Sequence, residues 1–381
     1  MTVTSTDVLI VGAGPAGLAT AIGLAQRGVD FLIVDALPEA QNTSRAAVIH
    51  SATLESLREL GVADLLIEQG IKVPNFRIRD RDSVLLHVDF AGLPSPTPYA
   101  LMIPQDESER ILIDRLSAQG HAIQRPVRLT GFEAINDGVR AKCATGSGEK
   151  VIEARYVVGA DGEKSSVRGQ AGIAFPGDSY GSFLLADVRM EWPIAKDEVT
   201  LFFSEAGTLV VAPMSRDRYR VVAQLPGAPS VPTIADVQKV IDSRGPRSGP
   251  RVGEVLWGSR FQVHHKLAER LRKGPVLLVG DAAHVHSPAG GQGMNLGLRD
   301  AAVLSEALAE ALRAGSSSAL DAYATERRAA AAEVLEMTDR LTRVATMANP
   351  TARWARNRLI ATAASLPQVR RYAARTLAGF N

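Results

Sequence analysis

The stretch that decides the fold reads DVLIV at residues 7–11, followed by GAGPAG at residues 12–17. The first segment is a run of apolar, partly β-branched residues without alternation, which predicts a strand buried on both faces. A helix is predicted over residues 16–26 with Gly28 placed to end it, and a second buried strand over residues 31–35. A strand, a helix and a strand within about 30 residues make a βαβ unit, and hence a parallel sheet.

The glycine pattern G-x-G-x-x-G lies between the first strand and the helix, which is the context that gives the pattern meaning. Gly12 permits the tight turn, Gly14 lets the backbone approach a pyrophosphate, and Gly17 lets the helix pack closely on the strand. The helix N-terminus offers unpaired N–H groups to phosphates, and Asp35 can accept hydrogen bonds from the adenosine ribose. The predicted contact residues are Gly12, Gly14, Pro15, Ala16, Gly17 and Asp35. This site alone does not choose between NAD and FAD.

The rest of the chain shows two kinds of strand pattern. Short apolar strands at residues 156–158 and 276–279 end abruptly in Gly and Asp, and they suit the same covered sheet. Residues 175–266 instead hold strand formers punctuated by Gly and Pro, and residues 76–90 add similar segments. We therefore expect an α/β nucleotide-binding domain that carries an inserted, mostly antiparallel β layer.

The C-terminal part is predicted to be helical. Apolar residues spaced by three or four follow Gly293, and a long Ala- and Arg-rich helix is expected over residues 319–348. Pro350 interrupts it, and one final basic helix is expected over much of residues 351–377. A basic amphipathic stretch can lie on membranes. We favour a solvated helix that packs over the substrate-binding region.

Composition restricts the class of protein. The 381 residues are 46% apolar and 22% charged, with a net charge of +2, which does not suggest nucleic-acid binding. The single cysteine, Cys143, excludes an internal disulfide and a Cys-rich metal site, and we predict no metal. The sequence shows no basic leader, and no apolar run reaches the roughly 18 residues that span a bilayer. We expect a cytoplasmic monomer or homodimer.

Two further segments carry a resemblance to a known family. Residues 158–168 include Asp161-Gly162 and look like a "DG" motif, and residues 280–295 include Gly280-Asp281 and look like a "GD" motif. With the N-terminal glycines they resemble, in order, the para-hydroxybenzoate hydroxylase family of FAD-dependent aromatic monooxygenases. The resemblance implies a glutathione-reductase-like FAD-binding Rossmann domain (residues 1–75, 98–174 and 267–349). A β substrate-binding domain (76–97 and 175–266) and C-terminal helices (350–381) complete it.

The resemblance also implies the cofactor contacts. Asp281, which we expect at the end of a buried strand, would meet a ribityl hydroxyl of FAD, because a buried carboxylate needs a partner. The glycine-rich loop before Met294 opens a helix whose dipole would face the flavin pyrimidine edge. The expected FAD contacts, beyond the N-terminal site, are Arg45, Gln105, Asp161, Asp281, Gly291, Gln292, Gly293, Met294 and Asn295.

The implied reaction is hydroxylation of a phenolic or polycyclic aromatic molecule. NAD(P)H would dock transiently near Asp161, Gly162 and Arg168, and O2 would form a C4a-hydroperoxide of the reduced flavin, on a face lined by Pro288, Gly290 and Gly291. Expected substrate contacts are Phe183, Phe202, Met214 and Trp257, around a moderately apolar ligand. The residues do not reveal a catalytic base, for which His50, His264, His265, His284 and His286 are available.

Several alternatives remain open at this point. A flavin-dependent reductase would consume NAD(P)H without inserting oxygen, and a non-catalytic binding protein could use the same fold. Epoxidation and degradation of a polycyclic antibiotic also belong to the same family. A flavin halogenase is disfavoured because Trp192, Trp257 and Trp354 are isolated, without that class's W-x-W-x-I-P segment. The single dinucleotide fingerprint disfavours a two-nucleotide-domain Baeyer–Villiger oxygenase.

Overall fold

A computed structural model describes residues 3–40, 46–215, 217–247, 249–288, 290–347 and 349–380. The predicted βαβ unit is present as β1 (Val3–Val11), α1 (Pro15–Gln26) and β2 (Phe31–Val34). β1 lies parallel to β2 on one side and to β10 (Gly148–Gly159) on the other. The residues at the end of β1 are fully buried, as the unbroken apolar run predicted.

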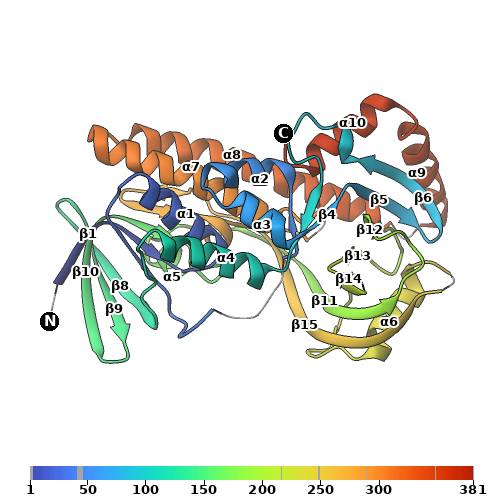
Figure 1. Ribbon diagram of the computed structural model, residues 1–381, viewed down its shortest axis with the longest axis horizontal. Helices are drawn as coiled ribbons and strands as arrows, with labels where there is room; N and C mark the ends of the chain where they lie inside the picture. The colour runs from blue at the N-terminus through green and yellow to red at the C-terminus, as the bar shows by residue number, and fades with distance from the viewer. Residues whose placement is uncertain are drawn as a thin grey trace.

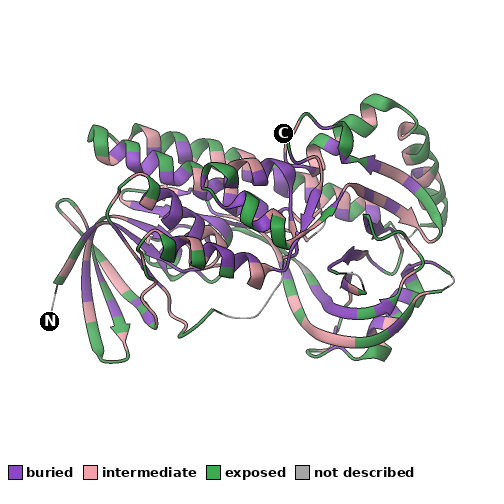
Figure 2. Ribbon diagram, viewed as in Figure 1, coloured by how far each residue is buried: buried purple, intermediate pink, exposed green. Residues whose placement is uncertain are grey.

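The first sheet has the order β16-β17-β10-β1-β2; β9 pairs antiparallel with β10, and β8 pairs antiparallel with β9. Helices α1, α4 and α7 pack on one another beside this sheet, and Figure 2 shows their inner faces buried. The bounds are β8 Val127–Ile135, β9 Gly138–Thr145, β16 Arg272–Lys273, β17 Val276–Leu278, α4 Gln105–Ala118, α5 Ser166–Gln170 and α7 Gly293–Ala314.

The second sheet has eight strands in the order β18-β15-β11-β14-β13-β12-β5-β6. Its pairs are antiparallel except for β12 with β5, and the long strands β11 and β15 bend through register shifts (Figure 1). Helix α6 (Ile234–Arg244) covers one face. The bounds are β5 Asn75–Asp80, β6 Ser83–Asp89, β11 Gly177–Glu191, β12 Glu198–Phe202, β13 Leu209–Pro213, β14 Arg218–Gln224, β15 Arg251–Leu267 and β18 His284–Val285.

Short elements connect the two sheets. A three-stranded sheet, ordered β3-β7-β4, lies between them, with helices α2 and α3 beside it. The bounds are β3 Val48–Ile49, β4 Ile71–Val73, β7 Ala100–Met102, α2 Ser51–Glu59, α3 Ala63–Gln69, and the single 3-10 turns η1 Phe90–Gly92 and η2 Gly280–Ala282.

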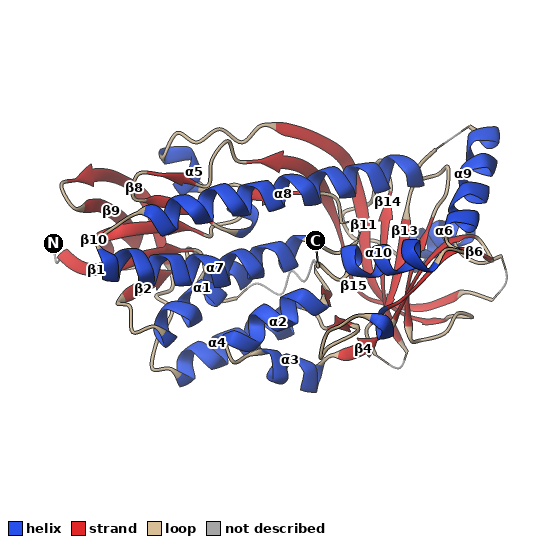
Figure 3. Cartoon of the chain, turned by 90° about the horizontal axis from the view of Figure 1, so that it is seen from above, coloured by secondary structure: helices blue, strands red, loops and turns tan. Residues whose placement is uncertain are grey.

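The C-terminal helices begin with α8 (Ser318–Ala345), which runs along α7 and reaches the second sheet (Figure 3). The single basic helix expected after it was wrong, because the structure has α9 (Pro350–Ala363) and α10 (Pro367–Leu377). Pro367 disfavours helical backbone at the residue before it, and Leu366 is accordingly extended, with φ −81° and ψ 123°. Both helices pack against β6.

Candidate functional site

The glycine loop after β1 has a backbone that other residues would not allow. Gly12 has φ +105°, and a Cβ there would lie 2.3 Å from the Ala160 carbonyl oxygen; a Cβ on Gly17 would lie 2.0 Å from the Gly12 oxygen. Gly14 differs, since an added Cβ would meet no protein atom within 4 Å. Gly14, Pro15 and Ala16 line the central cavity, so the open side of this loop faces a ligand site.

Asp35 holds this loop in place. Its carboxylate accepts hydrogen bonds from the backbone N–H groups of Ala13 at 2.7 Å and Leu37 at 2.8 Å. The guanidinium of Arg125 lies 3.9 Å away. A carboxylate has about four acceptor sites, so these bonds leave capacity for a ribose hydroxyl.

Asp161 lines the cavity and also caps a helix. Its carboxylate accepts from the Ser165 and Ser166 hydroxyls and from the backbone N–H of Ser166, at the start of α5. Arg168 is buried: it donates to the Ala282 carbonyl at 2.8 Å and stacks on the Phe175 ring at 3.8 Å. The Arg168 guanidinium therefore ties α5 to the turn that holds Asp281.

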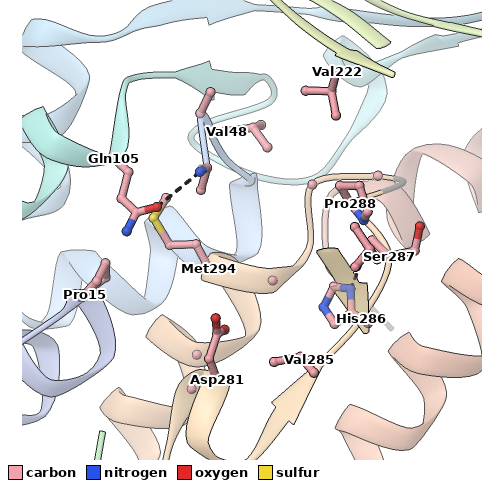
Figure 4. Close-up of a pocket in the computed structure, with 18 of the residues that line it drawn as sticks. Pro15, Val48, Gln105, Val222, Asp281, Val285, His286, Ser287, Pro288 and Met294 are labelled. Carbon is pink, nitrogen blue, oxygen red and sulfur yellow. Dashed lines mark hydrogen bonds between the residues drawn. The ribbon is translucent and has the colours of Figure 1, made fainter. Parts of the chain in front are cut away.

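Asp281 projects into the cavity from η2, opposite Val222 (Figure 4). As expected, Asp281 follows a buried strand, β17, and its side chain is exposed within the cavity. Gly280 has φ +65° and lies against Ala16, where a Cβ would approach the Ala16 methyl to 2.9 Å. The tight turn at Gly280 thus brings the Asp281 carboxylate beside the glycine loop.

The backbone of the loop before α7 is tightly constrained. Gly290 and Gly291 have φ of +85° and +64°, and a Cβ on Gly291 would lie 2.3 Å from a methyl of Val48. Pro288, Gly290, Gly291, Gly293 and Met294 line the cavity, and Met294 faces Gln105 (Figure 4). Gln105 accepts a hydrogen bond from the Ala46 N–H at 3.2 Å and donates to Glu109 at 2.8 Å.

Asn295 and Gln292 support this loop from behind, and neither lines the cavity. Asn295 accepts from the His50 N–H at 2.8 Å and donates to the carbonyls of Val48 and Gly291 at 2.9 and 2.8 Å. Gln292 donates to the Leu377 carbonyl of α10 at 3.0 Å. Their side-chain amides therefore form hydrogen bonds with the protein backbone. Arg45, the remaining expected contact, lies outside the described residues.

Two histidines that sequence reasoning left without a role line the cavity beside this loop. The His50 Nε2 atom lies 2.8 Å from the Gly290 carbonyl oxygen, and His286 Nδ1 lies 2.9 Å from the Ser287 carbonyl oxygen. Burial lowers the pKa of each imidazole to about 4, although the hydrogen bonds to these carbonyls act to raise it. Both are therefore neutral near pH 7.

The opposite side of the cavity is the face of the eight-stranded sheet that α6 does not cover. On β12, β13 and β14 alternate residues point into the cavity, as the two-residue period of a strand requires, whereas consecutive residues 261–264 of β15 line it. We call this surface the sheet wall; its residues are Phe76, Leu185, Val199, Leu201, Val210, Ala212, Arg220, Val222, Phe261 and Val263. The surface formed by the cavity-lining residues among 14–16 and 280–294 is called the loop wall.

None of the four expected substrate residues lines the cavity. Phe202 is buried in the core under α6, and Met214 is buried in the core that faces the C-terminal helices. Phe183 packs on the Phe261 ring with centroids 5.6 Å apart, and Trp257 pairs with Asp187 across the strands. Next to Phe202, Leu201 lines the cavity instead, because a shift of one residue along a strand moves a side chain to the other face.

A buried ion pair anchors the sheet wall. Arg220 on β14 donates two hydrogen bonds to Asp187 on β11, at 2.7 and 2.9 Å, and a third to the Ala46 carbonyl at 2.7 Å. Arg218 adds a bond to the same carboxylate at 2.7 Å. Burial acts to raise the pKa of Asp187, but the two arginines outweigh it and hold the pKa below its usual value. Sequence reasoning missed this pair, although R-Y-R on a strand places both cations on one face.

The two walls enclose one cavity of about 800 Å³. Its loop wall offers an open glycine backbone, the start of α7 and a carboxylate, which are the groups that suit a diphosphate and a flat polar ring. These residues fit FAD. Within the described residues no group of three His, Cys, Asp or Glu could hold a metal ion, and no helix is long and apolar enough to cross a membrane.

Comparison with known proteins identifies similar chains. Residues 5–338 match the sequence profile described as "FAD binding domain". The chain is 33% identical, over 352 residues, to 6-methylpretetramide 4-monooxygenase of Streptomyces rimosus; the match covers 91% of this chain and 63% of that protein. The chain therefore spans less than two thirds of the length of this relative.

Two solved structures are similar along nearly all of the chain. The anhydrotetracycline hydroxylase OxyS of Streptomyces rimosus is 32% identical with a TM-score of 0.82, and covers 98% of this chain and 76% of its own. The p-nitrophenol 4-monooxygenase PnpA of Pseudomonas putida has a TM-score of 0.87 at 23% identity, and covers 100% and 99%. The second likeness, at this low identity, shows the fold alone.

Proposed function

Because this chain belongs to the FAD binding domain family, we propose that it is an FAD-dependent monooxygenase that uses NAD(P)H and O2 to hydroxylate an aromatic small molecule. The observation that carries the proposal is the single cavity whose two walls suit two different ligands. The loop wall suits a dinucleotide, and the sheet wall suits a flat apolar molecule. Relatives named as monooxygenases of aromatic compounds support the same reaction class.

The loop wall would hold the cofactor. Gly14, Pro15 and Ala16 would face the diphosphate, which the resemblance also assigns to Arg45, and Asp35 would lie near the adenosine ribose. Asp281 and Gln105 would bind the ribityl chain, and the start of α7 would face the ring system, in a glutathione-reductase-like arrangement. When bound, FAD supplies the redox chemistry, accepting a hydride from NAD(P)H and activating O2.

The sheet wall would hold the substrate. Residues 76–97 and 175–266, which provide most of this wall, would form the substrate-binding domain. Apolar side chains such as Leu201 and Val222 would orient an aromatic ring towards Pro288 and Gly291 and exclude water from it. Arg220 is the one cation of this wall, but its guanidinium is held by Asp187 and Ala46. The wall therefore favours an uncharged ligand over an aromatic acid.

The neutral imidazoles of His50 and His286 line the cavity beside the glycine loop before α7, and each can accept or donate a proton. A phenolic substrate reacts faster when its hydroxyl loses its proton, since the phenolate pushes electron density into the ring. We propose that an imidazole of this pair accepts a hydrogen bond from that hydroxyl. Neither needs to be charged in the resting site, which agrees with their lowered pKa values.

The test is purification followed by a visible spectrum and by NAD(P)H oxidation with a panel of phenols and polycyclic aromatics. We expect bound FAD, substrate-stimulated oxygen uptake and a product that is heavier by one oxygen atom. Peroxide must be measured in parallel, because uncoupled oxidation also consumes oxygen. Anaerobic turnover without oxygen insertion would replace the monooxygenase by a reductase, and failure to bind flavin would favour a binding protein.

A further inference from the structure

The C-terminal segment has an unusual charge composition. Residues 349–381 contain six arginines and no Asp, Glu or Lys, whereas the whole chain carries a net charge of only +2. The six are Arg353, Arg356, Arg358, Arg370, Arg371 and Arg375. These helices therefore present cations with no carboxylate of their own to neutralise them.

Two of the six arginines serve the fold. Arg353 pairs with Glu205 at 2.5 Å, and Arg356 is buried, donates to the Val344 carbonyl at 2.8 Å and lies over the Phe203 ring. The other four are exposed, and within the described residues their guanidinium groups have no hydrogen bond or ion pair. Their free guanidinium groups are available to a partner. These four are Arg358, Arg370, Arg371 and Arg375.

The same helices expose large apolar side chains. Trp354 and Leu359 on α9 are each 69% exposed, Leu366 is 52% exposed, and Tyr372 on α10 is 72% exposed. Few other large apolar residues in the described part of the chain are as open to solvent. We call this set, with the four free arginines, the C-terminal basic surface.

The geometry places both kinds of side chain on outward faces. Helices α9 and α10 both pack against β6, and their inner residues, including Ile360 and Ala374, join the core beneath. Trp354 and Arg358 are four residues apart, as are Arg371 and Arg375, so each pair shares a helix face. Figure 1 shows both helices at the end of the molecule that is farthest from β8 and β9.

We infer that the C-terminal basic surface docks on an anionic lipid bilayer. Exposed Trp, Tyr and Leu among arginines are the composition of helices that lie in a membrane interface. Attraction of arginine to anionic lipid supplies the charge complementarity that this surface lacks within its own segment. A symmetric dimer through this surface would bring arginine towards arginine with no carboxylate from the segment between them, so the occupant we infer is lipid.

Co-sedimentation of the whole protein with vesicles tests this inference. We expect binding to vesicles of phosphatidylglycerol and phosphatidylcholine, no binding to phosphatidylcholine alone, and loss of binding at high salt. The variant R358Q/R371Q/R375Q should reduce the partition coefficient by roughly 100-fold, since each cation near an anionic surface contributes about fivefold. The matched control R128Q/R155Q/R313Q removes the same charge from the nucleotide-binding half and should retain binding.

Brominated lipids give a second, independent reading. They should quench the tryptophan fluorescence of the bound protein, and this quenching should disappear in W354F, because the remaining Trp192 and Trp257 are half-buried in the substrate sheet. Equal loss of binding in both triple variants would overturn the inference, since it would show a response to net charge alone. Self-association that depends on Trp354, without vesicle binding, would assign the surface to a second copy. All three readings are independent of catalytic turnover.

Discussion

The two walls of the cavity differ in what they present to a ligand. The loop wall presents mostly backbone, shaped by glycines with positive φ at positions 280, 290 and 291. The sheet wall presents side chains from alternate positions of several strands. A cofactor on the loop wall would be bound by a backbone conformation that only a few residue types allow. A substrate on the sheet wall would instead be bound by the shape of its side chains, which many residue types can supply.

The largest effect is expected at the ion pair behind the sheet wall. Asp187→Ala should lower the free energy of unfolding by about 3–5 kcal/mol, because Arg220 would remain buried without its partner. Chemical denaturation measures this loss. The double variant D187L/R220M should recover most of it, since an apolar pair of similar volume is close to neutral. If the double variant is no more stable than the single one, the pair does more than balance charge.

Beside the loop wall, His50 should make the stability of the protein depend on pH. His50 is neutral when folded because its pKa is about 4, and it charges near 6.5 when unfolded. Its contribution to stability is therefore complete above pH 6.5 and is lost as the pH falls towards 4. Between pH 7 and pH 5 the wild type should lose about 2 kcal/mol more than His50→Gln. Equal losses in the two proteins would mean that His50 has the same pKa in the folded and the unfolded protein.

A substitution at Gly14 should affect cofactor binding without affecting the stability of the protein. Gly14→Ala adds a methyl that meets no protein atom, so the melting temperature should not change. FAD should bind about tenfold more weakly, because the methyl faces the diphosphate. Flavin titration of the apoprotein measures this affinity. Gly169→Ala is the matched control, since its Cβ is equally free of contacts but lies outside the cavity; equal affinity in both variants would move the diphosphate away from Gly14.

The smallest effect is expected on the sheet wall itself. Val222→Thr puts a hydroxyl into the apolar surface and should raise KM for an apolar substrate about fivefold, a cost of about 1 kcal/mol, with little change in stability. Val221→Thr, one residue away on the opposite face, should lower stability and leave KM unchanged, because Val221 lies in the core under α6. Steady-state kinetics and thermal melts distinguish the two, and matching KM shifts would contradict the assignment of faces.

The sequence predicted the backbone-defined part of the molecule well. The βαβ unit, the position of α7 and the family resemblance are confirmed, because each depends on glycines or apolar runs that few conformations accept. Gly12 and Gly291 show why: an added Cβ would lie within 2.3 Å of a neighbouring atom at both positions. Motifs of this kind record backbone geometry directly.

The sheet wall could not be predicted in the same way. Phe202 and Leu201 are adjacent and both apolar, yet only Leu201 faces the cavity, and composition does not say which face of a strand is covered by a helix. The burial of Arg168 depends on a contact with Ala282, which lies 114 residues away along the chain. Such contacts leave no local pattern.

The hydrogen bond from Arg220 to the Ala46 carbonyl has a consequence for how the proposed activity could diversify. It joins β14 of the sheet wall to the segment before β3, so a change at Arg220 would disturb the proposed substrate and cofactor sites together. Val199 and Val210, on β12 and β13, also line the cavity, and their aliphatic side chains form no hydrogen bond of this kind. We expect directed evolution towards new substrates to accumulate changes at β12 and β13 and to leave Arg220 fixed.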